Sequence, residues 1–283
     1  MLNKFKLEEM VKAFFIEDLG DLDVTTDSIF NEKDIGTLTI QAKEAGIFCG
    51  QLIIESAYHL LDREVDVTLH VEDGERVEPT QEIARIHGPV PSLLKGERVV
   101  LNLIQRLSGI ATKTNKAVNM LDSDYTKISD TRKTTPGLRM LEKYAVRVGG
   151  GINHRLRLDD AVMIKDNHIA FAGSISEAVN RVRKNVGHMV KVEVEAENEQ
   201  HVLEAVEANV DVIMLDNVEL DQLYKLIQLI PRDITTELSG GIEIQDLPKY
   251  RELNVDVISM GCLTHQIESL DYSANQQFEK ERV

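Results

Sequence analysis

The stretch that decides the fold class runs from Val190 to Met260 and holds four short apolar segments in succession. They read Val190-Lys-Val-Glu-Val-Glu-Ala196, Val210-Asp-Val-Ile-Met-Leu-Asp216, Ile234-Thr-Thr-Glu-Leu-Ser239 and Val255-Asp-Val-Ile-Ser-Met260. Most are nearly continuous runs rich in Val and Ile, which is typical of strands buried on both faces. Two similar segments, Lys127–Arg132 and Ala161–Lys165, precede them. We therefore expect six strands.

Amphipathic patterns between these segments predict helices. Apolar residues recur every three or four positions over Ile175–Val186, Glu199–Ala208 and Leu220–Ile230. Pro136 with Gly137 indicates the start of another helix, which runs to Val148. Strands that alternate with helices in this way form parallel βαβ units. No Gly-x-Gly-x-x-Gly turn follows an early strand, which favours a barrel over a doubly wound sheet. With six strands, the barrel is an incomplete (β/α) barrel.

The first hundred residues predict a different architecture. Alternating polar and apolar residues over Thr37–Phe48 and Val65–Val71 predict antiparallel strands, and Glu72–Glu75 predicts a hairpin turn before Val77. Helices are expected over Leu7–Phe15, over Gln51–Leu61 and from Glu97 to Leu121. The fold class we predict is α/β, with an N-terminal α+β sandwich domain over residues 1–105 and an incomplete β/α barrel over residues 106–270. The C-terminal tail is expected to return to the first domain.

Charge is distributed unevenly along the chain. The net charge of −16 disfavours a nucleic-acid or anionic-membrane partner, since either would need a basic surface. Residues 95–165 nevertheless hold 14 Lys and Arg against 7 Asp and Glu, so the rest of the chain carries −23. A basic segment in an acidic protein concentrates cations for a small anionic ligand, although solvated helix faces are the alternative explanation.

Cysteine usage and hydropathy indicate the compartment. Cys49 and Cys262 are too few for a disulfide framework, which favours a reducing compartment. No apolar run approaches the roughly 18 residues that span a bilayer. The apolar run Ala13–Ile16 is too short for a signal peptide. We expect a cytoplasmic protein with no membrane partner.

Residues with useful chemistry stand at the ends of the predicted strands, where β/α barrels carry their catalytic groups. These ends are Asp130-Thr131-Arg132-Lys133, Lys165-Asp166-Asn167-His168, Glu195, Asp216-Asn217, Ser239-Gly240-Gly241 and Gly261. Arg and Lys suit carboxylates and phosphates, whereas Glu and Asp suit Mg²⁺ or sugar hydroxyls. A Ser-Gly-Gly turn lets backbone N–H groups approach a phosphate. The pattern predicts a site for a phosphorylated sugar beside a multiply anionic partner.

Some of these residues leave alternatives open. Glu193 and Glu195 point the same way on one strand, so only one of them is expected to face the ligand. Gly149–Gly151 is more typical of a loop than of a phosphate cradle. The spacing of His154 and His168 matches no zinc motif, and we expect no zinc. Cys262 lacks an evident base and is expected to be a buried thiol.

Several sequence blocks follow one another in order between Asp18 and Asp271. They are Glu97-Arg98 through Asn102, Ser108-Gly-Ile-Ala-Thr112, Asp130-Thr-Arg-Lys-Thr-Thr-Pro-Gly-Leu-Arg139, Gly149-Gly-Gly-Ile-Asn-His-Arg155, Ile164-Lys-Asp-Asn-His168, Leu215-Asp-Asn217, Ser239-Gly-Gly241 and Gly261-Cys-Leu-Thr-His265. In this combination the chain resembles the quinolinate phosphoribosyltransferases, also called nicotinate-nucleotide pyrophosphorylases (carboxylating).

The resemblance implies a reaction of NAD biosynthesis. Quinolinate and phosphoribosyl pyrophosphate would give nicotinate mononucleotide, pyrophosphate and CO₂, with Mg²⁺ as cofactor. Lys165, Glu195 and Asp216 would be catalytic, and the two carboxylates would also bind the metal. The implied substrate-binding residues are Arg98, Thr131, Arg132, Lys133, His154, Arg155, Lys165, Glu195, Asp216, Ser239, Gly240, Gly241, Met260, Gly261 and Cys262. The family also implies a homodimer in which Arg98 reaches the partner's site, or a hexamer of such dimers.

Three other functions are compatible with these residues. A related enzyme of the same architecture would take another pyridine or a molybdenum-linked substrate, although the dense Arg/Lys cluster favours a dicarboxylate. A nicotinate phosphoribosyltransferase would form the same nucleotide without releasing CO₂. The third alternative is a non-catalytic regulator that binds a metabolite and has kept the barrel. The presence of Lys165, Glu195 and Asp216 disfavours this alternative.

Overall fold

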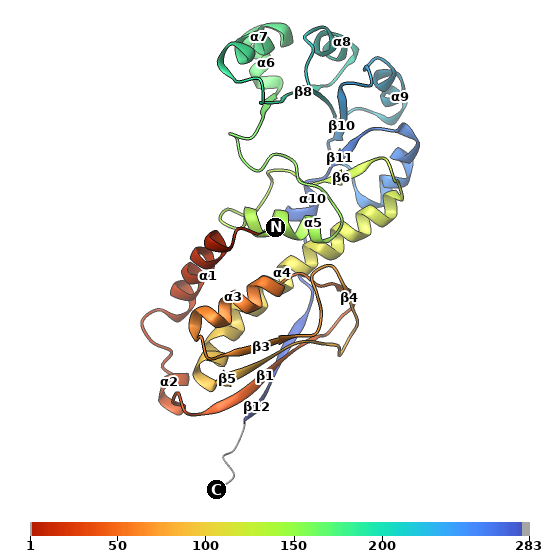
Figure 1. The fold of residues 1–283 in the computed structure, drawn as a ribbon. Coiled ribbons are helices and arrows are strands. Elements are labelled where there is room, and N and C mark those ends of the chain that lie inside the picture. The colour runs from red at the N-terminus through yellow and green to blue at the C-terminus, as the bar shows by residue number, and fades with distance from the viewer. Residues whose placement is uncertain (1, 279–283) are drawn as a thin grey trace. The chain divides into compact units, whose positions relative to one another are not determined.

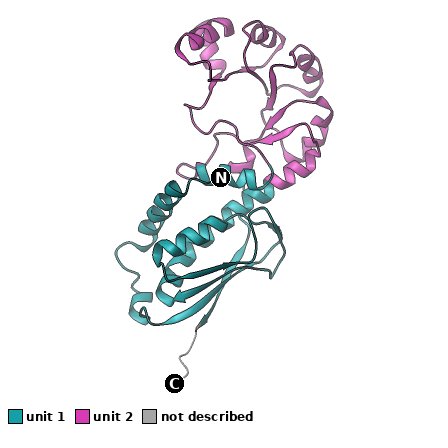
Figure 2. Ribbon diagram, in the orientation of Figure 1, with its two compact units in different colours: residues 1–113, 140–150, 267–283 teal, residues 114–139, 151–266 magenta. Residues whose placement is uncertain are grey.

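The computed structural model describes residues 2–278, and the chain divides into two compact units (Figures 1 and 2). Unit 1 comprises residues 1–113, 140–150 and 267–283, and unit 2 comprises residues 114–139 and 151–266. Each unit is therefore assembled from segments that are distant in the sequence. Residues 279–283 of the tail lie outside the described residues.

Unit 1 is built on a four-stranded antiparallel sheet. The strand order is β12 (Tyr272–Phe278), β1 (Ile35–Ala42), β5 (Glu82–Pro89) and β3 (Asp66–Leu69). Every second residue of β1 is buried, as expected for a strand with one face on a core. The helices whose residues lie largely in this unit are α1 (Lys4–Leu19), α2 (Thr26–Ile29), α3 (Gln51–Leu61), α5 (Arg139–Val148) and most of α4 (Val90–Leu121).

The predicted hairpin at Glu72–Glu75 is wrong. The strand that follows it, β4 (Arg76–Val77), pairs with β2 (Gly46–Ile47) in a separate two-stranded sheet instead of with β3. The reason lies in the hydrogen bonds of the turn. The Asp73 carboxylate accepts from the backbone N–H groups of Gly50 and Gln51, at 2.6 and 3.0 Å, at the start of α3. These bonds direct the turn toward β2.

Three helices begin elsewhere than predicted, and α1 is the first of them, at Lys4 instead of Leu7. Helix α4 starts at Val90 instead of Glu97, because Pro91 is tolerated in a first turn, where its missing N–H has no intrahelical partner. Arg98 therefore lies in the interior of this helix. Helix α5 starts at Arg139 instead of Pro136, because Gly137 has a φ of +85°, which is outside the helical region.

Unit 2 is a six-stranded parallel sheet. Its order is β6 (Lys127–Ser129), β11 (Val257–Ser259), β10 (Thr235–Ser239), β9 (Val212–Asp216), β8 (Val192–Ala196) and β7 (Val162–Ile164). All six predicted strands are present, each somewhat shorter than predicted. The edge strands β6 and β7 do not pair among the described residues, so the barrel is incomplete (Figure 1). The mixed α/β class that the sequence predicted is confirmed.

Helical segments follow the strands β7 to β11 along the chain. They are α6 (Asp166–Ala172), α7 (Ile175–Asn185), α8 (Glu199–Glu207), α9 (Leu220–Gln228), the 3₁₀ segment η1 (Ile244–Leu253) and α10 (Cys262–His265). Over residues 2–278, no helix has both the length and the apolar character needed to cross a membrane.

The register of the parallel strands sets which residues share the barrel interior. Glu195 of β8 and Glu237 of β10 both align with Met214 of β9, and Ser239 aligns with Asp216. Alternate residues of a strand point to the same face. The interior of the incomplete barrel is therefore lined by polar and charged side chains near the carboxyl ends of the strands.

Candidate active site

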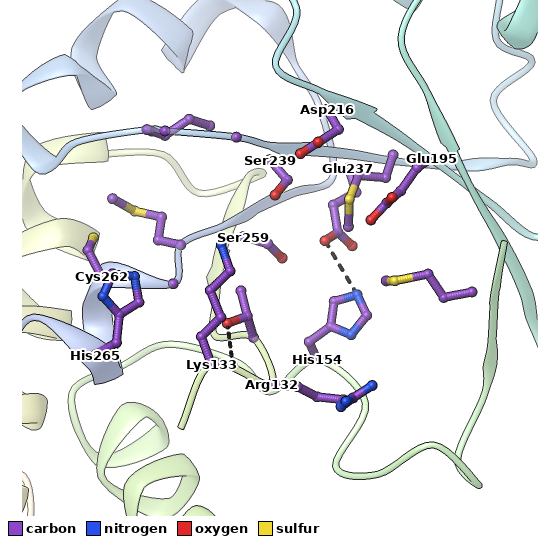
Figure 3. Close-up of a pocket in the computed structure, with 18 of the residues that line it drawn as sticks. Arg132, Lys133, His154, Glu195, Asp216, Glu237, Ser239, Ser259, Cys262 and His265 are labelled. Atoms are coloured by element: carbon purple, nitrogen blue, oxygen red, sulfur yellow. Dashed lines mark hydrogen bonds and ion pairs between the residues drawn. The ribbon is translucent and has the colours of Figure 1, made fainter. Parts of the chain in front are cut away.

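A cavity of about 550 Å³ lies in unit 2 and takes residues from the carboxyl-end regions of all six strands (Figure 3). The predicted site residues that line it are Thr131, Arg132, Lys133, His154, Arg155, Lys165, Glu195, Asp216, Ser239, Gly240, Gly241, Met260, Gly261 and Cys262. Arg98 is not among its lining residues and belongs to unit 1. The strand-end prediction thus points to one common cavity.

One side of the cavity is cationic. Nε of Arg132 is buried and has no hydrogen-bond partner within residues 2–278. Burial, and then the charge of Arg132, lowers the pKa of the Arg155 guanidinium. The two guanidinium groups thus repel each other, and the nearby carboxylates of Glu193, Glu195 and Asp160 offset this lowering of the Arg155 pKa only in part. Together with Lys133, they provide donor groups of the kind that bind carboxylate or phosphate oxygens.

A buried carboxylate holds the loop of residues 151–155, which carries part of this cationic side. Asp130 is fully buried, and its carboxylate accepts from the backbone N–H of His154 at 2.9 Å and from the Asn153 amide at 2.6 Å. Ile152 also bridges to Ser129 at the end of β6. These contacts fix the loop, and with it Arg155, to the barrel.

His154 lies between two buried glutamates, and we call His154, Glu193 and Glu237 the His154 cluster. Nε2 lies 3.3 Å from a Glu193 carboxylate oxygen and 3.4 Å from a Glu237 oxygen, and the second contact is drawn in Figure 3. Nδ1 accepts a hydrogen bond from the backbone N–H of Arg155 at 2.8 Å. Nδ1 therefore presents a lone pair, and the proton of the ring is on Nε2.

This tautomer decides what the His154 cluster can do. Its three ligand atoms lie within 4.8 Å of one another, a spacing compatible with a metal ion. A protonated Nε2, however, donates to the carboxylates and offers no lone pair to a metal. Burial alone would lower the pKa of His154, but Glu193 and Glu237 outweigh it and raise the pKa to about 10. The two carboxylates thus favour a charged ring, whereas the 2.8 Å hydrogen bond from the Arg155 N–H needs the Nδ1 lone pair and therefore a neutral ring. We assign the neutral ring with its proton on Nε2, because that hydrogen bond is a direct geometric observation.

The opposite side of the cavity carries carboxylates. Glu195 forms an ion pair with Nζ of Lys165, and Asp216 accepts from the side-chain amide of Asn217 at 2.8 Å. Of the two glutamates of β8, Glu195 lines the cavity, whereas Glu193 is not a lining residue and contacts His154. The alternative left open by the sequence is thereby resolved.

The glycines after β10 bring backbone to the cavity wall. Gly240 has a φ of +100°, and a Cβ atom there would lie 2.4 Å from Oδ1 of Asn217. Gly241 has a φ of +60° and faces open space. Both conformations favour glycine, and the bare backbone lets a phosphate approach the N–H groups. Gly149–Gly151 is a loop outside the cavity lining, in keeping with the interpretation as a loop.

Sequence reasoning missed part of the cavity wall. The additional lining residues are Met163, Met214, Glu237, Ile242, Glu243, Ser259, His265 and Gln266. Strand alternation carries a signal for four of them, because each stands two positions before a predicted residue: Met163 before Lys165, Met214 before Asp216, Glu237 before Ser239 and Ser259 before Gly261. Cys262 is half-buried and lines the cavity, so the expectation of a buried thiol is wrong.

Comparison with known proteins identifies the family. Residues 23–108 match the N-terminal domain, and residues 110–275 the C-terminal domain, of quinolinate phosphoribosyl transferase. The chain is 51% identical over 282 residues to the probable nicotinate-nucleotide pyrophosphorylase (carboxylating) of Bacillus subtilis (strain 168), covering 100% of this chain and 97% of that protein. It is 38% identical to the nicotinate-nucleotide pyrophosphorylase (carboxylating) of Homo sapiens, covering 96% and 92%.

A solved structure agrees with these relatives. The crystal structure of NadC from Streptococcus pyogenes matches with a TM-score of 0.95 and 41% identity, covering 99% of each chain. The resemblance of the sequence blocks is confirmed, and with it the expectation of a phosphoribosyltransferase. The chain belongs to the quinolinate phosphoribosyltransferase family.

Proposed function

We propose that this enzyme transfers phosphoribosyl from phosphoribosyl pyrophosphate to quinolinate in NAD biosynthesis, with release of pyrophosphate and CO₂ and formation of nicotinate mononucleotide. The observation that carries the proposal is the combination of two subsites in one cavity. Arg132, Lys133 and Arg155 suit the two adjacent carboxylates of quinolinate, and the Ser239–Gly241 turn suits a phosphate.

The reaction begins at C1 of the ribose. The C1–oxygen bond breaks and its electron pair leaves with pyrophosphate, while the lone pair of the pyridine nitrogen forms the new C1–N bond. The ring nitrogen is then cationic, and this charge stabilises the electron pair that remains on C2 when the C2–carboxylate bond breaks and CO₂ leaves. C2 finally takes up one proton. The cationic side of the cavity orients the acid, and Lys165 with Glu195 and Asp216 holds the donor.

Mg²⁺ is the cofactor that we propose, with Glu195 and Asp216 as its protein ligands. Both carboxylates line the cavity, and one or two carboxylates with substrate phosphate oxygens are the donor set that Mg²⁺ prefers. When bound, Mg²⁺ would neutralise charge on the departing pyrophosphate. Removal of divalent cations with EDTA is expected to abolish turnover and Mg²⁺ to restore it; full turnover without divalent cations would contradict the assignment.

Product analysis tests the proposed reaction. The purified protein is incubated with phosphoribosyl pyrophosphate, Mg²⁺ and quinolinate labelled with ¹³C in the 2-carboxylate; the product is weighed by mass spectrometry and labelled CO₂ is trapped. The alternative enzyme, a nicotinate phosphoribosyltransferase, would use nicotinic acid. Nicotinic acid lacks the 2-carboxylate and would leave a buried cation of this cavity unpaired, at a cost on the order of several kcal/mol. Comparable kcat/KM values for the two acids would exclude quinolinate specificity.

We also propose that the enzyme acts as a cytoplasmic homodimer with Arg98 serving the partner's cavity. Arg98 is exposed, and its side chain has no ion pair or hydrogen bond with the described part of the chain, while Glu97 accepts from the Gln276 amide. Neither Cys49 nor Cys262 forms a disulfide, in keeping with a reducing compartment. If Arg98 acts in trans, mixing Arg98→Ala with Lys165→Ala under subunit exchange should restore up to about a quarter of the unsubstituted activity. No recovery after verified exchange would refute the shared site.

A further inference from the structure

Glu237 is the cavity residue with the least expected environment. It stands at an interior position of β10, and its side chain is only 5% exposed. Oε1 is 3.4 Å from Nε2 of His154, yet it makes no hydrogen bond with any residue from 2 to 278. Glu237 nevertheless lines the cavity. A carboxylate that is dehydrated and incompletely bonded costs stability, so its retention at this position needs a reason.

The other carboxylates around the cavity differ from Glu237. Glu195 is paired with the Lys165 ammonium, and Asp216 accepts from the Asn217 amide. Glu193 shares His154 with Glu237 but is not a lining residue. Glu237 thus combines access to the cavity with a side chain that is 5% exposed and with an oxygen, Oε1, that has no hydrogen-bond partner in the described chain.

Glu237 lies between residues of the two proposed subsites, Ser239 on one side and Arg132 on the other. Figure 3 shows its carboxylate among Ser239, Glu195 and His154, with Arg132 beyond His154. Ribose C1 and the pyridine nitrogen must meet between the subsite for the acid's carboxylates and the subsite for the donor's phosphates. A fixed carboxylate in a water-poor site stabilises a developing cation more strongly than one in bulk water.

We propose that Glu237 is a further catalytic residue, whose carboxylate faces the reacting centre and offsets the positive charge that forms first at ribose C1 and then on the ring nitrogen. The inference rests on the proposed function and assigns one more residue to it. No bond to Glu237 forms or breaks, and no proton is transferred to it. Nε2 of His154 faces this carboxylate across the cluster at 3.4 Å before the substrates bind.

Glu237→Gln tests the proposal, because it removes the charge and keeps the size and shape of the side chain. We expect kcat to fall about 10²-fold, as when another preorganised electrostatic contact is lost, with the KM of both substrates little changed. The equilibrium Kd of quinolinate, measured by calorimetry, should also stay near that of the unsubstituted enzyme. The charge matters only once the cation develops, so ground-state binding is spared.

Glu193→Gln is the matched control, since it removes the other buried carboxylate of the His154 cluster without altering the cavity wall. We expect kcat of this variant to fall clearly less than that of Glu237→Gln. Equal losses of kcat, or an unchanged kcat in Glu237→Gln, would overturn the proposal, because Glu237 would then act only by holding His154 or not at all.

A third variant keeps the proposal testable if Glu237→Gln folds poorly, as thermal unfolding would reveal. Glu237→Asp keeps the negative charge but shortens the side chain by one methylene, so the carboxylate lies farther from the reacting centre. Its kcat should stay above that of Glu237→Gln, and an equal or lower kcat would overturn the proposal. Absence of quinolinate turnover by the unsubstituted enzyme would refute the proposed function itself. Failure of the reaction and failure of the Glu237 assignment therefore give different results.

Discussion

Replacing Asp130 by alanine tests how the cavity keeps its cationic side in place. The fully buried carboxylate of Asp130 accepts hydrogen bonds from the His154 N–H and the Asn153 amide, at 2.9 and 2.6 Å. Arg155 follows directly on the same loop, and its N–H is bonded to the ring of His154. Loss of the carboxylate releases this loop, and the guanidinium of Arg155 moves with it.

The magnitude follows from the two lost bonds. A hydrogen bond to a charged group contributes about 1.5–3 kcal/mol, so Asp130→Ala should lower the free energy of unfolding by about 3–6 kcal/mol. Asp130→Asn keeps one acceptor, and the Asn153 amide can turn to restore a neutral bond, so we expect a loss of only about 1–2 kcal/mol. A displacement of Arg155 by about 1 Å should lower kcat/KM for quinolinate roughly 10²-fold in the alanine variant.

Urea unfolding followed by far-UV circular dichroism measures the stability, and steady-state kinetics measures kcat/KM. Asp124→Ala is the control, because Asp124 is exposed on the segment just before β6; its free energy of unfolding should change by less than about 0.5 kcal/mol. If the free energy of unfolding of Asp130→Ala lies within about 1 kcal/mol of that of the unsubstituted protein and kcat/KM is unchanged, the carboxylate does not hold the loop.

Three further changes have definite expected outcomes. Lys165→Ala should lower kcat/KM by roughly 10²–10³-fold in steady-state assays while circular dichroism shows an intact fold; near-normal turnover would make it a surface lysine. Gly240→Ala should raise the KM for phosphoribosyl pyrophosphate, because its new methyl group meets Asn217, and an unchanged KM would speak against a phosphate subsite there. Burial alone would raise the pKa of Asp256, but hydrogen bonds from Thr236 and Tyr125 outweigh it and lower the pKa. The ionised Asp256 therefore stabilises the fold above about pH 4, and this stabilisation is lost as the pH falls through the lowered folded-state pKa. Asp256→Asn should therefore lower the free energy of unfolding by about 1 kcal/mol at pH 7, and the difference should shrink in urea titrations below about pH 4; a constant difference would refute the cause.

The parallel strands were predictable from the sequence because strands buried on both faces leave a strong local signal. The segment Val212–Asp216 is apolar almost throughout, and its place in the sheet follows from the regular alternation with helices. The failed hairpin at Glu72–Glu75 had an equally clear turn signal. A turn signal, however, does not say which strand the chain meets next. That choice depends on the bonds from Asp73 to the start of α3, between residues more than twenty positions apart.

The strand-end rule located the cavity but not all of its chemistry. It selects the last residue of each strand, whereas alternation brings the residue two positions earlier, such as Glu237 or Ser259, to the same interior. Asp130 escaped attention for another reason. Its partners Asn153 and His154 lie on a separate loop, and only the folded chain brings them together. Composition and spacing cannot reveal a contact of this kind.

The division of charge between strands and loops has a physical consequence for the whole barrel. The carboxylates of Glu193 and Glu237 are fixed on rigid strands, while Arg132 and Arg155 reach the cavity from loops. Burial raises the pKa of Glu193, the hydrogen bond with His154 lowers it, and the neighbouring Glu237 raises it again; the net rise means that the ionised Glu193 costs the empty fold stability. Apolar residues of similar volume at such positions are often more stabilising. The Glu237 carboxylate is therefore best explained by the reaction, since a site built for a cationic transition state must hold negative charge before the cation forms, whereas Glu193 contacts His154 outside the cavity wall.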